Sequence, residues 1–181
     1  MSCLCTNHIM TMCVIIYKPK GVELPSIELL TKAHQRNPHG CGLVTPNVYY
    51  KGLSFESFKR HIKKCSAEEP MLIHFRLATH GSIKKSNCHP FFDSETNTFF
   101  MHNGVLSAIK VKGDRTDSET AFRNILVPYI KRYGLDSIEL AETANWIKGY
   151  SKFAFMQDDR VILFGDYIYR DGLYFSNMRF I

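Results

Sequence analysis

Apolar residues recur along the chain in two periods, and the pattern predicts about a dozen strands and helices. Short apolar runs bounded by turn residues are typical of buried strands, whereas apolar positions three and four apart are typical of amphipathic helices. The predicted strands are 13–17, 41–44, 48–50, 71–78, 98–101, 152–157, 160–166 and 173–175. The predicted helices are 25–36 (opened by Pro25), 54–64, 117–133 and 137–148, and residues 79–97 are expected to form a long polar loop.

Helices grouped between sets of antiparallel strands predict a layered α+β fold. The length of 181 residues is typical of one domain with a full core, and 13 Phe and 9 Tyr favour a sheet-rich core over disorder. No segment has the apolar length that a membrane span needs.

The net charge and the spacing of the cysteines narrow the range of possible functions. The formal net charge is +6, but the Lys and Arg residues are scattered, which argues against nucleic-acid binding as the main function. The six cysteines include no CxxC pair and no zinc-ligand spacing, so we expect no metal and no cofactor. Free thiols and the absence of a signal peptide favour a cytoplasmic protein.

Cys13 is the residue on which the functional interpretation depends, because it follows Met12 at the head of an apolar strand. If residues 1–12 are a leader, a propeptide or a misassigned start, Cys13 begins the mature domain, 13–181. An N-terminal cysteine carries a thiol nucleophile and a free α-amine that serves as its base. Read alone, a cysteine in an apolar strand is more often a small buried hydrophobe.

Three further polar clusters fit a site built around that thiol. Asn103 and Gly104 could donate a carboxamide N–H and a backbone N–H to an oxyanion. Arg76 can bind a carboxylate with two parallel hydrogen bonds, and Asp117 can pair with an ammonium group. Arg76 and Asp117 together match the two charges of an α-amino acid, and glutamine is the one that carries a γ-amide. Each cluster also has a structural interpretation, since Asn-Gly is a common turn and Asp favours helix starts.

The order of these clusters resembles the class II glutamine amidotransferases, which are N-terminal-nucleophile hydrolases. The stretches that carry the resemblance are MCVII, NPHGCGL (37–43), HFRLATHGSIKKSNCHPF (74–91), MHNGVL (101–106) and GDRTDSETAF (113–122). Their spacing is most similar to that of the small stand-alone members. The family fold implied is a four-layer αββα sandwich of mostly antiparallel sheets.

The resemblance also implies a role for each motif residue. Cys13 would be the nucleophile and Asn103 with Gly104 the oxyanion hole. The substrate α-carboxylate would be bound by Arg76 and Thr79, together with His80, and the α-ammonium by Asp117.

Three functions remain open from the sequence. The chain could release ammonia from glutamine, through a γ-glutamyl thioester, for a separate synthetase subunit. It could hydrolyse a γ-glutamyl amide of a larger amine. It could also be a catalytically silent binding or regulatory module in which residues 1–12 are retained and Cys13 has no free amine.

Overall fold

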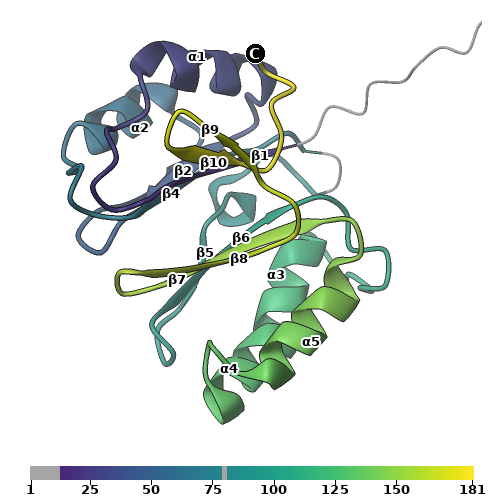
Figure 1. Ribbon diagram of the computed structural model, residues 1–181. Coiled ribbons are helices and arrows are strands. Elements are labelled where there is room, and N and C mark those ends of the chain that lie inside the picture. The colour runs from purple at the N-terminus through teal and green to yellow at the C-terminus, as the bar shows by residue number, and fades with distance from the viewer. Residues whose placement is uncertain (1–12, 79–80) are drawn as a thin grey trace, which may run out of the picture.

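The computed structural model describes residues 13–78 and 81–181, which form two antiparallel sheets flanked by helices (Figure 1). The strands are β1 (Val14–Lys18), β2 (Cys41–Val44), β3 (Tyr49–Gly52), β4 (Met71–Phe75), β5 (Phe91–Asp93), β6 (Thr98–Asn103), β7 (Lys152–Gln157), β8 (Arg160–Phe164), β9 (Ile168–Arg170) and β10 (Leu173–Phe175). The helices are α1 (Ile27–Arg36), α2 (Phe55–Ile62), the 3-10 turn η1 (Lys85–Asn87), α3 (Asp117–Ala121), the π-helical turn η2 (Phe122–Leu126), α4 (Val127–Tyr133) and α5 (Ile138–Lys148).

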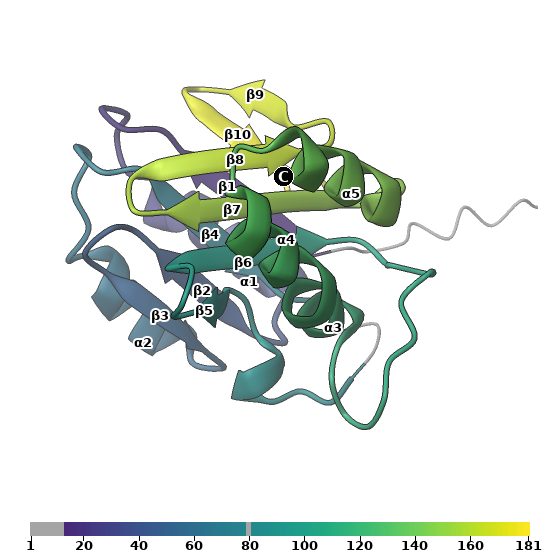
Figure 2. The same ribbon diagram turned by 90° about the horizontal axis from the view of Figure 1, so that it is seen from below.

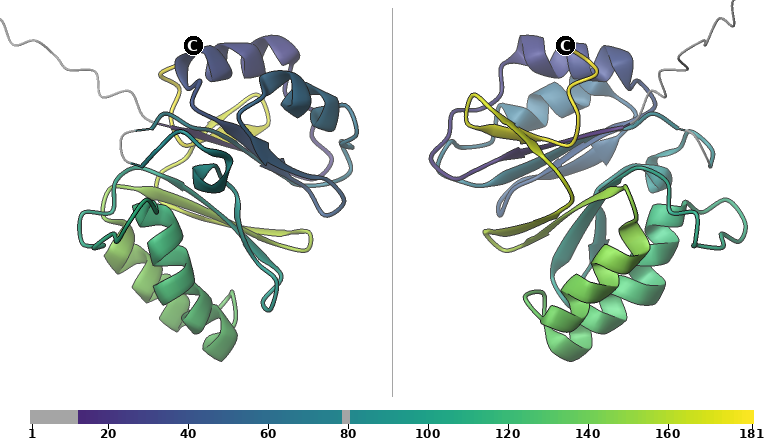
Figure 3. Two further views of the ribbon diagram at one scale, coloured as in Figure 1. Left: turned by 180° about the vertical axis from the view of Figure 1, so that it is seen from behind. Right: turned by 45° about the vertical axis from the view of Figure 1, so that its right-hand side comes forward.

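The strands divide into a six-stranded sheet, in the order β3-β2-β4-β1-β10-β9, and a four-stranded sheet, in the order β5-β6-β7-β8. Helices α1 and α2 cover the outer face of the first sheet, and α3, α4 and α5 cover the outer face of the second (Figures 1 and 2). The two sheets face each other between these helical layers, as the views in Figure 3 also show. The expected α+β sandwich of four layers is therefore confirmed.

Alternation along the strands explains the layers, because successive side chains of a strand point to opposite faces. In β1, Val14 and Ile16 belong to the core beneath α1 and α2, whereas Ile15 belongs to the core between the sheets. In β6, Phe100 packs towards α3 to α5 and Met101 towards the first sheet. Each sheet thus buries both of its faces.

Serine residues cap the N-termini of α1, α2 and α5. The hydroxyl oxygens of Ser26, Ser54 and Ser137 each accept a backbone N–H from three residues further on, at 3.2 Å. Such a cap typically contributes about 1 kcal/mol. The expectation that Pro25 opens the first helix is wrong, because the helix starts at Ile27 behind the Ser26 cap.

The strand predictions are confirmed in place, with some differences at their ends, but two short strands were missed. The segment 79–97, expected to be a loop, contains η1 and β5, and β9 lies between two strands that were predicted. Both missed strands have three residues, which is too few for alternation to be read from a sequence.

Candidate functional site

The site forms where several strands begin or end at one end of the sandwich. Strands β1 and β4 are antiparallel with Val14 opposite Phe75, so the start of β1 lies beside the end of β4. Cys13 directly precedes β1 and Arg76 directly follows β4, and the register therefore places these two residues next to each other. The ends of β6 and β10 reach the same region through the hydrogen bonds described below.

Cys13 is held by its backbone and by its thiol. The Leu77 N–H donates to the Cys13 sulfur at 3.2 Å, and the thiol lies 3.4 Å from the Leu77 carbonyl oxygen. The Cys13 carbonyl oxygen accepts a hydrogen bond from Asn177 Nδ2 at 2.7 Å. These contacts hold the sulfur at the start of β1, a central strand of the first sheet, where Cys13 is partly exposed.

Burial raises the pKa of the Cys13 thiol, and the Asp117 charge adds to that effect. The Leu77 N–H and the Arg76 guanidinium lower the pKa but do not offset burial. The thiol therefore stays protonated at neutral pH unless a base removes its proton. The register of β1 and β4 places Arg76 beside Cys13, and the charge of Asp117 also reaches the thiol.

Arg76 is buried, with 4% of its surface exposed. Its side chain contacts the loop that follows β4. Its Nη1 donates to the Ser82 carbonyl oxygen at 3.1 Å and its Nη2 to the Gly81 carbonyl oxygen at 3.4 Å. The guanidinium thereby positions the segment after residue 80. Thr79 and His80, expected to bind substrate with Arg76, lie outside the described residues.

Asn103 ends β6 and is buried at 2% exposure. Its Nδ2 donates to Ser176 Oγ at 2.8 Å, and Ser176 Oγ also accepts the Ile15 N–H at 2.8 Å. Among the described residues, the Asn103 Oδ1 has no hydrogen-bond partner. Rotating the carboxamide by 180° lets the Ser176 hydroxyl donate to Oδ1 and turns both amide protons away from Ser176. That orientation satisfies the buried oxygen and leaves Nδ2 available as a donor.

Gly104 has a backbone conformation that other residues rarely adopt, with φ at +139°. A Cβ at this position would lie 2.2 Å from Ser151 Oγ and 2.9 Å from Ser151 Cα. Ser151 itself is fixed by donating to the Val105 carbonyl oxygen at 3.1 Å. The turn after Asn103 therefore requires glycine on both steric and conformational grounds.

Asp117 is the first residue of α3, behind the Thr116 N-cap, whose Oγ1 accepts the Glu119 N–H at 3.1 Å. Its Oδ2 accepts the Leu106 N–H and its Oδ1 the Ser118 N–H, each at 2.8 Å. The carboxylate thus joins the helix start to the loop 104–116 that follows Gly104. The Ser118 hydroxyl also donates to Oδ1, at 3.3 Å. A carboxylate offers about four acceptor positions, so these three bonds leave one position for an ammonium group.

Three buried histidines connect the two sheets behind the site. His74 Nε2 lies 3.1 Å from the His102 carbonyl oxygen, and His102 Nδ1 lies 2.7 Å from Ser118 Oγ. The His74 and His89 rings pack with centroids 4.2 Å apart. Burial lowers the pKa of His74 to about 3, that of His102 to about 4, and that of His89 well below its usual value. All three are neutral at pH 7, and the contacts of His74 and His102 link β4, β6 and α3.

The sequence analysis did not identify Ser176, Asn177 or Ser118. Ser176 and Asn177 follow β10 directly, so the signal that selected Asn103, a polar residue at the end of an apolar strand, was present for them too. Ser118 stands in the quoted TDSE motif, but its contact with His102 depends on how α3 packs against β6.

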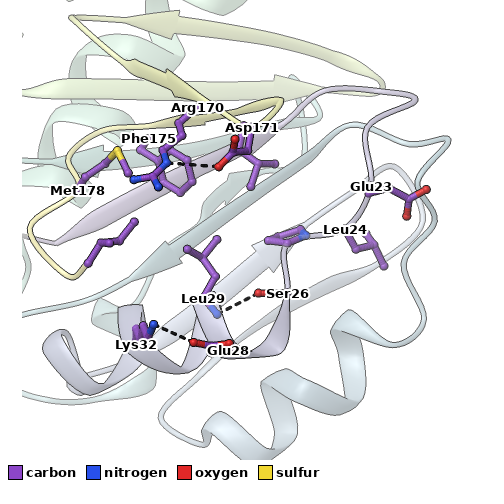
Figure 4. A pocket seen from close by; sticks show the side chains of 13 residues that line it. Glu23, Leu24, Ser26, Glu28, Leu29, Lys32, Arg170, Asp171, Phe175 and Met178 are labelled. Carbon is purple, nitrogen blue, oxygen red and sulfur yellow. Dashed lines mark hydrogen bonds and ion pairs between the residues drawn. The ribbon is translucent and has the colours of Figure 1, made fainter.

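A hollow of about 370 Å³ lies elsewhere, between α1 and the β9–β10 hairpin (Figure 4). Two ion pairs lie in its wall, Lys32 with Glu28 at 2.8 Å and Arg170 with Asp171 at 3.3 Å. None of the candidate site residues that the structure describes lines it. It is therefore separate from the cysteine site.

In residues 13–78 and 81–181, no group of three His, Cys, Asp or Glu side chains could hold a metal ion. Cys13, Cys41, Cys65 and Cys88 are free thiols. Within the same ranges, every helix is too short or too polar to cross a membrane.

Comparison with known proteins connects this geometry to a family. A stretch of 76 residues is 30% identical to a putative glutamine–fructose-6-phosphate aminotransferase (isomerizing) of Saccharomyces cerevisiae, covering 38% of this chain and 29% of that protein. A stretch of 37 residues is 46% identical to a glutamine–fructose-6-phosphate aminotransferase (isomerizing) of Methanococcus maripaludis, covering 20% of this chain and 6% of that protein. The chain thus matches less than a third of the length of either relative.

The family model described as "Glutamine amidotransferases class-II" matches residues 60–161. That range is more than half of the chain, and it includes Arg76, Asn103, Gly104 and Asp117. The chain therefore belongs to the class II glutamine amidotransferases.

Proposed function

We propose that the chain hydrolyses the γ-amide of glutamine with Cys13 as an N-terminal nucleophile. The observation that carries the proposal is the convergence on one thiol of a cationic group, Arg76, and an anionic group, Asp117. Both charges act on the Cys13 sulfur. A site with one charge of each sign beside a nucleophile fits the headgroup of an α-amino acid.

The raised pKa of the Cys13 thiol makes a base necessary. A free α-amine on Cys13 titrates at about 7.7–8.0 and would accept the thiol proton, through a water molecule. The thiolate then attacks the γ-carbonyl carbon, and the amide nitrogen takes the proton and leaves as ammonia. Water cleaves the resulting γ-glutamyl thioester, which releases glutamate and restores the thiol.

This mechanism requires that residues 1–12 are removed or not translated, so that residues 13–181 form the working domain. While Met12 is attached, the Cys13 nitrogen belongs to a peptide bond and cannot act as a base. We include this processing in the proposal.

Asn103 and Gly104 are assigned to the oxyanion. The orientation in which Ser176 donates to Asn103 Oδ1 supports this role, because it frees Nδ2 to donate to developing negative charge. The constrained backbone at Gly104 supports a fixed N–H beside it. Removing one such donor typically lowers the rate by about 10²–10³-fold.

Arg76, with Thr79 and His80, is assigned to the α-carboxylate and Asp117 to the α-ammonium. The Arg76 guanidinium donates to loop carbonyls at 3.1 and 3.4 Å, and the longer of these contacts is at the limit of a hydrogen bond. A carboxylate would be a stronger acceptor for the same donors.

The substrate and the destination of the ammonia complete the proposal. We propose free glutamine as the substrate, with ammonia passed to a separate synthetase subunit in the cytoplasm. A γ-glutamyl amide of a larger amine is the alternative, and it needs no such partner. A substrate panel that measures released ammonia against other released amines separates the two.

The decisive experiment compares the full chain with a form that begins at Cys13, produced by cleavage of a fusion. We expect glutamine hydrolysis only from the trimmed form, and none from the trimmed form carrying Cys13→Ala. Activity that survives Cys13→Ala would refute the proposal. If the chain is instead a catalytically silent module, protein from its native source should have an intact mass that includes residues 1–12. Neither form should then hydrolyse glutamine.

A further inference from the structure

The loop 104–116 and the helix that follows it form a second polar hollow, which lies outside the cysteine site. Its volume is about 280 Å³, and it is lined by Lys110, Lys112, Arg115, Thr120 and Asn124. Three of these five residues carry a positive charge and none carries a negative charge. The concentration of cations contrasts with the scattered charges along the rest of the sequence.

The neighbouring carboxylates are already engaged with other groups. Asp114 accepts hydrogen bonds from Lys84 and Ser82, which lower its pKa to about 2. Glu119 pairs with Arg123 at 2.9 Å. Within the described ranges, no ion pair joins any of the three lining cations to a carboxylate.

The donors around the hollow suit an oxyanion with several acceptor atoms. A guanidinium presents paired N–H donors that match phosphate geometry, and ammonium groups add point charges. Asn124 follows Thr120 by one helical turn, so both lie on the same side of the helix. The Thr120 hydroxyl donates to the Thr116 carbonyl oxygen at 2.9 Å, which leaves the exposed Asn124 carboxamide as the neutral donor.

We propose that Lys110, Lys112, Arg115 and Asn124 bind the phosphate group of a small phosphorylated molecule. Three converging cations repel one another, and a phosphate with its two negative charges relieves that repulsion. The hollow has room for more than the phosphate itself. The binding site stands on the lining residues alone and does not depend on whether glutamine is the substrate.

The same loop leads to the cysteine site at both ends. It starts after Gly104 and ends at Asp117, and the Leu106 N–H donates to Asp117 Oδ2 at 2.8 Å. A ligand in the hollow therefore contacts the same loop that donates to Asp117, the group assigned to the substrate ammonium. This connection suits a phosphorylated effector of the enzyme.

The test measures binding to the full chain by calorimetry at low ionic strength. The probes are ribose 5-phosphate, ribose, inorganic phosphate and a short single-stranded RNA. We expect ribose 5-phosphate to bind and ribose not to bind. Inorganic phosphate should compete, and weaker binding of inorganic phosphate than of ribose 5-phosphate would indicate that the rest of the molecule also contacts the hollow.

Two double variants separate the site from net charge. K110A/K112A should weaken ribose 5-phosphate binding at least about tenfold, because two charge-assisted contacts are lost. K63A/K64A removes the same charge from two exposed lysines after α2 and should leave binding unchanged. Equal weakening by both variants would overturn the proposal. So would tight binding of RNA without binding of ribose 5-phosphate, which would assign the hollow to nucleic acid.

Discussion

The Ser176 hydroxyl is the contact that joins the start of β1 to Asn103, and its removal is the sharpest test of the site. Ser176 is 1% exposed, and its Oγ accepts the Ile15 N–H and contacts the Asn103 carboxamide, each at 2.8 Å. Ser176→Ala deletes both contacts without adding bulk. The change leaves the Ile15 N–H buried without its hydroxyl acceptor.

The expected loss of stability follows from these two contacts. An unsatisfied buried donor costs about 1–3 kcal/mol, and a lost hydrogen bond to the carboxamide costs about 0.5–1.5 kcal/mol. We therefore expect the free energy of unfolding to fall by about 1.5–4.5 kcal/mol. For a domain of this size each kcal/mol lowers Tm by about 2–4 °C, so Tm should fall by roughly 3–18 °C.

The catalytic effect should appear in kcat. Without Ser176 the Asn103 carboxamide can turn away from the oxyanion, and we expect kcat for glutamine to fall about ten- to hundredfold. KM should change little, because the proposal assigns binding of the substrate ground state to Arg76 and Asp117. Both constants are measured by coupled ammonia release on protein that begins at Cys13.

A matched control distinguishes positioning from general destabilisation. Thr98 lies at the opposite end of β6, is fully buried, and donates to the Thr96 carbonyl oxygen at 3.1 Å. Thr98→Val should lower Tm and leave kcat unchanged. If Ser176→Ala lowers Tm while kcat stays at the wild-type value, the hydroxyl is only structural and the argument about Asn103 is refuted.

Three further predictions follow from the site. Gly104→Ala should unfold the turn, because a Cβ there meets Ser151 and the positive φ alone costs about 1–3 kcal/mol. Thermal unfolding should show a lower Tm. The second change Ser151→Gly should restore Tm only in part, because it removes the clash but not the strained φ. Asp117→Asn should raise KM for glutamine about 10- to 100-fold, through loss of a charge-assisted contact, and an equal KM would contradict its assignment to the ammonium. The pKa values of the three buried histidines are lowered in the folded state, so stability is fully present above pH 6.5 and falls as pH drops towards about 4. Each histidine can lower the free energy of unfolding by up to about 1.4 kcal/mol per pH unit in that window. Urea titrations at pH 7, 6 and 5 measure this, and equal free energies of unfolding would contradict the burial argument.

The clusters that make up the site were largely predictable because each is local in sequence. Arg76, Asn103 and Asp117 stand at strand ends or a helix start, and those boundaries can be read from hydrophobic periodicity. The layered arrangement was predictable for a similar reason. Strands such as β1 are apolar at successive positions, which indicates that both faces are buried.

The element order, the polar clusters at the element ends and the resemblance that led to the family could all be read from the sequence. Which of those ends meet depends on how the chain folds. Ser176 contacts Ile15 across 161 positions and Asn103 across 73, and His102 contacts Ser118 because α3 packs on β6. Such contacts depend on sheet register and on the packing of distant segments, and a local hydrophobic pattern carries no information about either.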